Sequence, residues 1–180
     1  FVDRPNARSA HQTPTPVGAG ICFALSVTVA LLVPSSLTTD SALWLLVLQG
    51  FGLGVALVGL IDDRFGLPAW LRLFAYLAVA TVAALTLLGT TPALMIGLAI
   101  LALGWNINLV NFMDGIDGFV VTQSLCVCLG LAVISLCLPD ASGVTHLTLV
   151  LVAALLPFLW LNWPPARVFM GDSGAVFLGF

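Results

Sequence analysis

Residues 106–118 read NINLVNFMDGIDG, the end of an apolar run that closes in a cluster of amides and carboxylates. Four of these polar residues recur at every third position: Asn108, Asn111, Asp114 and Asp117. On an unbroken α-helix this spacing rotates by about 60° per step, so Asn108 and Asp117 would lie on opposite faces. Gly115 and Gly118 can each end a helix or turn the chain back, and we expect them to return the carboxylates to the amides in one pocket. Such a group at the border of an apolar segment indicates binding of a cation, a phosphate, or both.

The composition indicates the class of protein. Of the 180 residues, 61% are hydrophobic and 7% are charged, and the mean hydropathy is +1.16. These values are typical of a polytopic membrane protein and lie far outside soluble usage. The sequence has no His and Cys cluster for zinc and no glycine-rich phosphate loop with Lys, which argues against a zinc site and an ATPase.

Apolar runs long enough to cross a bilayer predict an all-α fold, a polytopic transmembrane helical bundle. We expect about six full spans and the start of a seventh, over 17–34, 42–61, 70–88, 94–110, 119–138, 147–163 and after 174. Trp70 and Arg72 look like an interface anchor that opens the third span. No soluble domain is visible, so we expect one integral-membrane domain over 1–180, truncated at both ends.

The segments between the spans alternate in charge. All five Arg and six of the eight Asp fall in the loops at 1–16, 62–72, 106–118 and 163–174. The links at 35–41, 90–93 and 139–146 hold no Arg and only Asp40 and Asp140. By the positive-inside rule the charged side is cytoplasmic. Every candidate group therefore faces one compartment, as a single active site at a cytoplasmic membrane surface requires.

Each candidate has a structural and a functional interpretation. Asp62 and Asp63 could be a solvated loop or the N-cap of the next helix; alternatively, they bind a metal or act as a general base, because adjacent acids share a site when a cation offsets their repulsion. Asp172, in FMGDSG, could be a helix cap. Arg167 is the arginine we most expect to pair with an anion, and His11 lies on the correct side to contact a phosphate.

Taken together, the motifs point to phosphoryl chemistry. Carboxylates and an amide suit Mg²⁺, which takes oxygen ligands and usually keeps phosphate oxygens in its shell. A magnesium-dependent phosphoryl site on membrane helices indicates the joining of a soluble nucleotide substrate to a lipid.

The segments NINLVNFMDGIDGF, DDRFG and PARVFMGDSGAVFLGF resemble the signature segments of the polyprenyl-phosphate N-acetylhexosamine-1-phosphate transferases. DRPNARSAHQTPTPVGAG is similar to the segment after the first helix of that family. The family includes the bacterial phospho-MurNAc-pentapeptide translocase and the undecaprenyl-phosphate GlcNAc-1-phosphate transferases. The run WNWPPARVFMGD most resembles members that initiate O-antigen or other surface polysaccharides. The resemblance covers the whole chain and implies a larger polytopic enzyme of the bacterial inner membrane.

The resemblance implies transfer of a sugar-1-phosphate from a UDP-N-acetylhexosamine to undecaprenyl phosphate, with release of UMP. It implies Mg²⁺, or Mn²⁺, as cofactor and the lipid bilayer as surroundings, with no nucleic acid partner and with a homodimer as the expected assembly. By motif position, Asn111 and Asp172 match the metal ligands, and their side-chain oxygens are expected within about 5 Å of each other. Asp62 and Asp63 match the first acidic pair of the family, which activates the lipid phosphate or attacks as nucleophile. Asp114 and Asp117 match the second acidic pair, near the nucleotide. Further substrate contacts are expected from Asn108, Arg167 and His11.

One position departs from the pattern. Many relatives carry a third acidic residue, or Lys in the translocase, where this chain has Gly66. This difference argues against the translocase subfamily.

Two other classes stay open on the residues alone. A CDP-alcohol-type lipid phosphotransferase would also use Asp and Mg²⁺, but it clusters its carboxylates on consecutive helix turns with Gly-Ala-Arg. A transporter would place its acids near the membrane midplane rather than at span ends. Release of UMP from a UDP-sugar, dependent on polyprenyl phosphate, would separate the three.

Overall fold

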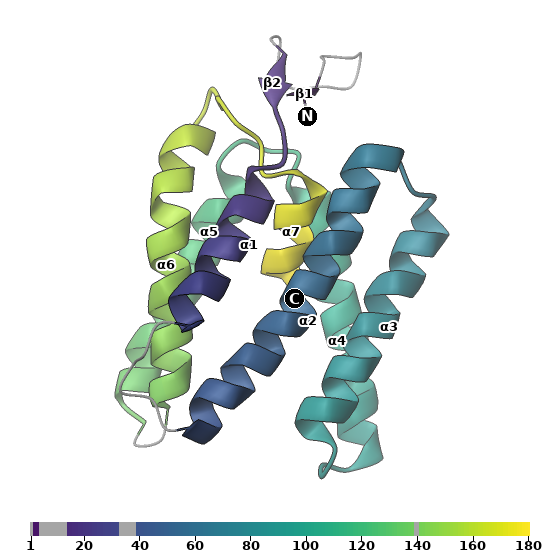
Figure 1. The fold of residues 1–180 in the computed structure, drawn as a ribbon, viewed down its shortest axis with the longest axis vertical. Helices are drawn as coiled ribbons and strands as arrows, with labels where there is room; N and C mark the ends of the chain where they lie inside the picture. The colour runs from purple at the N-terminus through teal and green to yellow at the C-terminus, as the bar shows by residue number, and fades with distance from the viewer. Residues whose placement is uncertain (1, 4–13, 33–38, 139–140) are drawn as a thin grey trace.

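The computed structural model describes residues 2–3, 14–32, 39–138 and 141–180 and folds them into a helical bundle with one small pair of strands (Figure 1). The elements in chain order are β1 (Val2–Asp3), β2 (Thr15–Pro16), α1 (Ala19–Leu32), α2 (Thr39–Phe65), α3 (Ala69–Leu88), α4 (Ala93–Met113), α5 (Phe119–Leu136), α6 (Ser142–Asn162) and α7 (Gly171–Gly179). Within the described part, five helices, α2 to α6, are long and apolar enough to cross a membrane. This confirms the predicted all-α polytopic bundle. The first expected span corresponds to α1, a shorter apolar helix of 14 residues.

The loops that carry the predicted site all lie at one end of the bundle. The chain segments at 14–18, 65–69, 113–119 and 162–171 gather at the top of Figure 1, whereas the turn between α3 and α4 and the start of α6 lie at the bottom. We call the end formed by these four segments the motif end. These four segments overlap the loops that carry Arg and most of the Asp, which the alternation of charged and uncharged loops in the sequence predicted to lie on one side.

The second helix runs further than expected. The charges at 62–64 predicted a loop, but α2 continues through Phe65, so Asp62 and Asp63 lie in its last turn. Gly66 then adopts a left-handed φ of +65°, and its N–H donates to the carbonyl of Asp62 at 2.8 Å. This is a common way to end a helix, and it favours glycine at that position. Pro68 holds the N-cap of α3, so the interpretation of the two acids as an N-cap is wrong.

The N-terminal segment, expected to be a loop, contains a short antiparallel pairing. Val2 pairs with Pro16 and Asp3 with Thr15. Beyond β2 the chain runs beside the loop that precedes α7, because Val17 forms a parallel bridge with Phe169 and the Phe169 N–H donates to the Pro16 carbonyl at 2.9 Å. The N-terminal segment therefore braces the loop that leads into α7.

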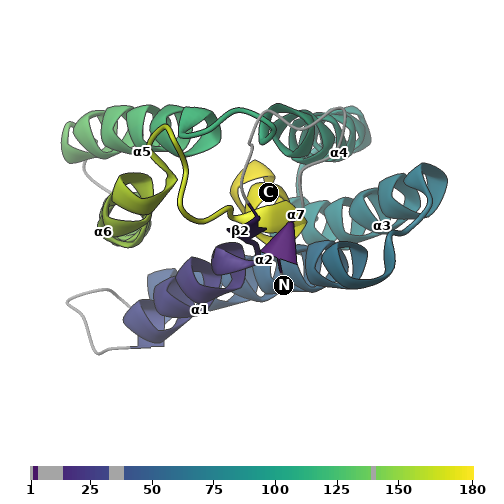
Figure 2. The ribbon, with the colours of Figure 1, turned by 90° about the horizontal axis from the view of Figure 1, so that it is seen from above.

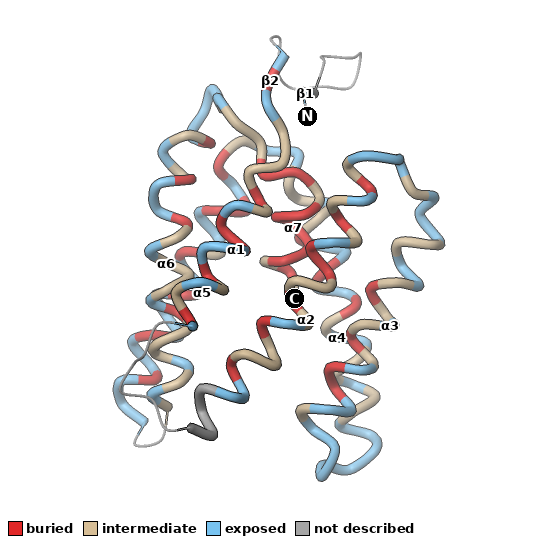
Figure 3. The backbone as a smooth tube through the Cα atoms, viewed as in Figure 1, coloured by how far each residue is buried: buried red, intermediate tan, exposed pale blue. Residues whose placement is uncertain are grey.

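The short helix α7 lies in the centre of the bundle, with the other helices around it (Figure 2). It contacts α1, α2 and α4, and Figure 3 shows its backbone mostly buried, in contrast to the outer helices. Its neighbours approach at backbone distance: a Cβ on Gly20 would lie 2.2 Å from the Cα of Gly174, and a Cβ on Gly179 would lie 2.7 Å from the Cα of Ile107. Gly174 faces α1, so its missing side chain is explained by helix packing.

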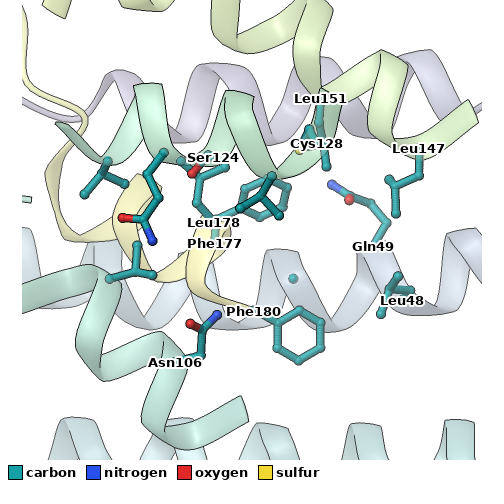
Figure 4. A pocket seen from close by; sticks show the side chains of 15 residues that line it. Leu48, Gln49, Asn106, Ser124, Cys128, Leu147, Leu151, Phe177, Leu178 and Phe180 are labelled. Carbon is teal, nitrogen blue, oxygen red and sulfur yellow. The ribbon is translucent and has the colours of Figure 1, made fainter. Parts of the chain in front are cut away.

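A cavity of about 330 Å³ lies deeper in the bundle, between α2, α4, α5, α6 and α7 (Figure 4). Its wall is mostly apolar, and two of its polar side chains join helices. The Nε2 of Gln49 donates to the Ala24 carbonyl at 3.1 Å, and the Nδ2 of Asn106 donates to the Gly179 carbonyl at 2.7 Å. None of the predicted site residues lines this cavity, so the candidate chemistry lies elsewhere, at the motif end.

Candidate functional site

At the motif end, the carboxylate of Asp62 bridges α2 and α3. Its Oδ1 accepts the N–H of Leu67 at 2.6 Å, and its Oδ2 accepts Nη1 of Arg72 at 2.7 Å. Only 6% of Asp62 is exposed, and a buried carboxylate needs such partners to remain charged. Arg72, expected as an interface anchor, has further contacts that the sequence did not predict. Its guanidinium belongs to the site and also lies 3.6 Å from Oδ2 of Asp172.

The carboxylate of Asp63 turns the other way, toward α7. Its two oxygens accept the N–H groups of Asp172 at 2.9 Å and of Ser173 at 3.2 Å. Adjacent residues on a helix point about 100° apart, which allows the pair to serve two neighbours at once. The two predicted catalytic acids thus have separate partners.

Asp172 lies in the first turn of α7 rather than in a loop. Met170 holds the N-cap, so the helix-cap interpretation of Asp172 is wrong. Burial raises the pKa of Asp172 to about 7; a hydrogen bond with Asp62 and the charges of Asp63 and Asp62 act in the same direction, while Arg72 opposes them. The raised pKa of Asp172 reflects the nearby carboxylates of Asp62 and Asp63 as well as its burial.

Asp114 completes this group from the end of α4, where it forms the C-cap. Burial raises the pKa of Asp114 to about 8, and the charges of Asp172 and Asp63 contribute to the rise. Four carboxylates from three segments, the ends of α2 and α4 and the start of α7, therefore interact at the motif end: Asp62, Asp63, Asp114 and Asp172. Accumulated negative charge of this kind favours a bound cation.

Asn111 and Asn108, both within residues 106–118, lie in different environments. Asn111 lies in the last turn of α4, and its Oδ1 is buried with no hydrogen-bond partner in the part of the chain that the structure describes. An oxygen left in this state favours a ligand. Asn108 lies one turn earlier on α4 and is exposed. Of the two glycines expected to turn the chain, Gly118 does so with φ +71°, whereas Gly115 does not adopt a positive φ.

Asp117 holds two loops together. Its Oδ2 accepts the N–H of Ala166 at 2.9 Å, which ties the turn after α4 to the loop before α7. Asn162, of which 5% is exposed, reinforces the same junction. Its Oδ1 accepts the N–H of Gly118 at 2.9 Å and its Nδ2 donates to the Val168 carbonyl at 3.0 Å.

Of the two remaining substrate candidates, Arg167 and His11, only Arg167 belongs to the part of the chain that the structure describes. The side chain of Arg167 is exposed, with its guanidinium carbon 6.0 Å from the centre of the Trp160 ring, within the range of a cation–π contact. His11 lies outside the described residues, as do Arg4 and Arg8. The structure therefore leaves the proposed phosphate contacts of Arg167 and His11 as predictions.

Three residues in or beside the site were not predicted. Arg72 is ten residues from Asp62 and follows a turn, so no local pattern joins them. Asn162 lies at the end of an apolar run, and a single amide in that place does not indicate a function by itself. Tyr76 is fully buried, and its hydroxyl has no hydrogen-bond partner among the described residues. It lies one turn after Arg72 on α3.

The donor set fits Mg²⁺ only with further ligands. Among the described residues, no three acid, His or Cys side chains converge closely enough to hold a metal ion by themselves. The unpartnered Oδ1 of Asn111 and the carboxylates of Asp172 and Asp114 are oxygen donors of the kind Mg²⁺ prefers. A site of this composition takes its remaining ligands from water and from the phosphates of a substrate.

Residues 43–180 match the family described as glycosyl transferase family 4. A phospho-N-acetylmuramoyl-pentapeptide-transferase of Heliobacterium modesticaldum is 31% identical, over 92% of this chain and 58% of the relative. A probable undecaprenyl-phosphate N-acetylglucosaminyl 1-phosphate transferase of Bacillus subtilis is 29% identical, over 99% of this chain and 52% of the relative. A decaprenyl-phosphate N-acetylglucosaminephosphotransferase of Mycolicibacterium smegmatis is 31% identical, over 97% of this chain and 50% of the relative.

The chain spans between 50% and 58% of the length of these relatives. Identities of 31% and 29% do not separate the pentapeptide transferase from the N-acetylglucosaminyl transferase. They therefore give no support to the argument that Gly66 sets the chain apart from the former. Gly66 has instead a conformational explanation in its positive φ.

Proposed function

This chain belongs to glycosyl transferase family 4, and we propose that the full-length protein transfers a sugar-1-phosphate from a UDP-N-acetylhexosamine to undecaprenyl phosphate. An oxygen of the acceptor phosphate attacks the β-phosphorus of the UDP-sugar. The bond from that phosphorus to the bridging oxygen breaks, and UMP leaves with that oxygen. The observation that carries the proposal is that four acids, Asp62, Asp63, Asp114 and Asp172, lie near one another at one end of a membrane bundle, where Arg72 and the first turn of α7 link three of them. The relatives' names support a polyprenyl-phosphate acceptor and an N-acetylglucosamine phosphate as the transferred group, and the UDP donor rests on the resemblance of the sequence motifs.

The residues divide between the two substrates. We assign Asn111 and Asp172 to a bound Mg²⁺, for which Mn²⁺ is a substitute, with Asp114 beside them. Held by these residues, Mg²⁺ would supply positive charge that offsets the negative charge developing on the leaving UMP. We assign Asp62 to the acceptor-phosphate side through Arg72, because it holds the guanidinium of Arg72 at 2.7 Å and a guanidinium is suited to a phosphate oxygen.

The remaining substrate contacts stay assigned to the nucleotide side. Asp117 and Asn108 belong to the turn and the helix that carry Asp114, and Arg167 follows in the next loop of the motif end. His11 is assigned to a phosphate by its place in the sequence. We also propose that the motif end faces the cytoplasm of a bacterium, because the loops there are arginine-rich, and that the product initiates O-antigen or a similar surface polysaccharide.

The decisive experiment is an assay of the purified full-length protein in detergent with a panel of UDP-N-acetylhexosamines. UMP release should require both undecaprenyl phosphate and a divalent cation, and one sugar should be preferred. A CDP-alcohol as donor should give no product. UMP release that is independent of the lipid phosphate, or solute uptake by proteoliposomes without UMP release, would contradict the proposal.

A further inference from the structure

Asp63, the second of the two adjacent acids at the end of α2, accepts hydrogen bonds at both carboxylate oxygens from N–H groups in the first turn of α7. The N–H groups at the start of a helix have no partner within that helix and carry partial positive charge. A carboxylate that accepts two of them forms charge-assisted hydrogen bonds. Met170, at the N-cap of α7, makes no capping bond with its own side chain. Asp63 therefore supplies from α2 the cap that α7 lacks.

Two glycines hold the carboxylate against α7. A Cβ on Gly59, one turn before Asp63, would lie 2.7 Å from the Cα of Ser173, so α2 and α7 touch at backbone distance there. A Cβ on Gly171 would lie 2.8 Å from Oδ2 of Asp63, and that glycine has a φ of +75°. The carboxylate is thus enclosed between the two helices, and any displacement of it also displaces the residue that follows Gly171.

We propose that Asp63 is a positioning residue, which fixes the first turn of α7 and so sets the carboxylate of Asp172, rather than a base or nucleophile that acts on the acceptor phosphate. Its effect on metal and substrate rests on the function proposed above. As a nucleophile, one oxygen of Asp63 would become the bridging oxygen of an acyl phosphate, a much weaker acceptor. As a base, it would take a proton onto a carboxylate that already accepts two N–H groups. Either step would loosen α7 at the moment when Asp172 is needed.

The test compares four variants of the full-length protein in detergent. Asp63→Ala removes both acceptors, and Asp63→Asn keeps one. Gly59→Ala keeps the carboxylate but forces α2 away from α7. Gly54→Ala is the matched control on the same helix, because nothing lies within 4 Å of a Cβ there. The readouts are hydrogen–deuterium exchange of the peptide that contains residues 172 and 173, and Mn²⁺ affinity by electron paramagnetic resonance.

We expect Asp63→Ala to speed exchange at the start of α7 by at least about tenfold, the scale of one lost hydrogen bond. It should weaken Mn²⁺ binding by about 10–100-fold, as loss of a residue that orients a ligand does. Asp63→Asn should lie between Asp63→Ala and the wild type. Gly59→Ala should resemble Asp63→Ala although its carboxylate is intact, and Gly54→Ala should match the wild type.

Three outcomes would overturn the positioning role. The first is unchanged exchange and Mn²⁺ affinity in Asp63→Ala together with lost UMP release. The second is normal turnover in Gly59→Ala with α7 displaced. The third is a phosphorylated Asp63 trapped from the wild type by rapid acid quench and identified by mass spectrometry. Failure of the wild type to release UMP from any UDP-sugar would instead defeat the proposed function, and would leave the exchange result to stand by itself.

Discussion

Individual residues at the motif end show how one short sequence serves several helices. Asp62 and Asp63 are neighbours in the chain, yet the first binds Arg72 on α3 and the second binds the peptide groups of α7. Asp117 likewise accepts a peptide N–H from a loop 49 residues away. Three of the acids thus hold the structure together, whereas burial and neighbouring carboxylates raise the pKa values of Asp114 and Asp172.

The raised pKa values predict a pH-dependent stability. In the unfolded chain an Asp titrates near 3.8, and in the folded protein the pKa of Asp172 is about 7 and that of Asp114 about 8. The folded state therefore holds these protons more tightly. The stability they contribute is fully present below pH 3.8 and is lost as the pH rises through 7 to 8.

With a chelator present, we expect the Tm of the full-length protein in detergent to fall between pH 6 and pH 9. Asp114→Asn, which keeps the shape of the neutral acid, should lose less over the same range. Calorimetry or a thiol-reactive dye would follow the transition. Equal pH dependence in the variant and the wild type would assign the effect to other groups.

At the scale of the elements, glycine positions decide where α7 can lie. Gly20 on α1 meets Gly174 on α7 with no room for a methyl group, although neither glycine has a positive φ. Packing at backbone distance is a known use of small residues between membrane helices. The glycines of α1 and α7 are therefore explained by their contact, not by backbone conformation.

Substituting alanine for a glycine at a helix contact and for one away from any contact should separate the effect of packing on stability from the effect of helix propensity. Gly20→Ala places a Cβ 2.2 Å from the Cα of Gly174, so we expect loss of folded protein or a Tm lower by more than 10 °C, on the order of several kcal/mol of overpacking. Gly130→Ala on α5 meets nothing within 4 Å and should stabilise by up to about 1 kcal/mol, because alanine is the better helix former. Size-exclusion profiles and thermal unfolding measure both. Equal behaviour of the two variants would contradict the packing described for α7.

On the scale of the whole molecule, the motif loops share one end of the bundle. We expect single cysteines at exposed positions there, Phe65→Cys and Trp163→Cys, to react with a membrane-impermeant reagent from the same side. Leu138→Cys, at the other end, should react from the opposite side. The background protein would have its four cysteines replaced: Cys22, Cys126, Cys128 and Cys137. If positions 65 and 163 reacted from opposite sides of the membrane, the motif loops could not form a single site.

Hydropathy alone could predict the spans, because each crossing needs a run of apolar residues of known length. It misplaced the end of α2, since charged residues were taken to mark a loop although a helix can extend past the bilayer core. It could not predict Arg72 or Asn162 in the site, because their partners are defined only by the folded arrangement. The central place of α7 was also out of reach, since it depends on matched glycines 154 residues apart in the chain, Gly20 and Gly174.

The central place of α7 has a consequence for biogenesis. Ribosomes make this helix after α1 to α6, yet it occupies the slot between α1, α2 and α4. The contacts of α1, α2 and α4 with this slot are therefore completed only after all six earlier helices have been made. Until residues 171–179 emerge, Asp63 has no peptide groups to accept, and the acids at the motif end cannot assemble. The nascent protein should thus acquire its site in one late event, when a nine-residue helix joins a scaffold that is already made.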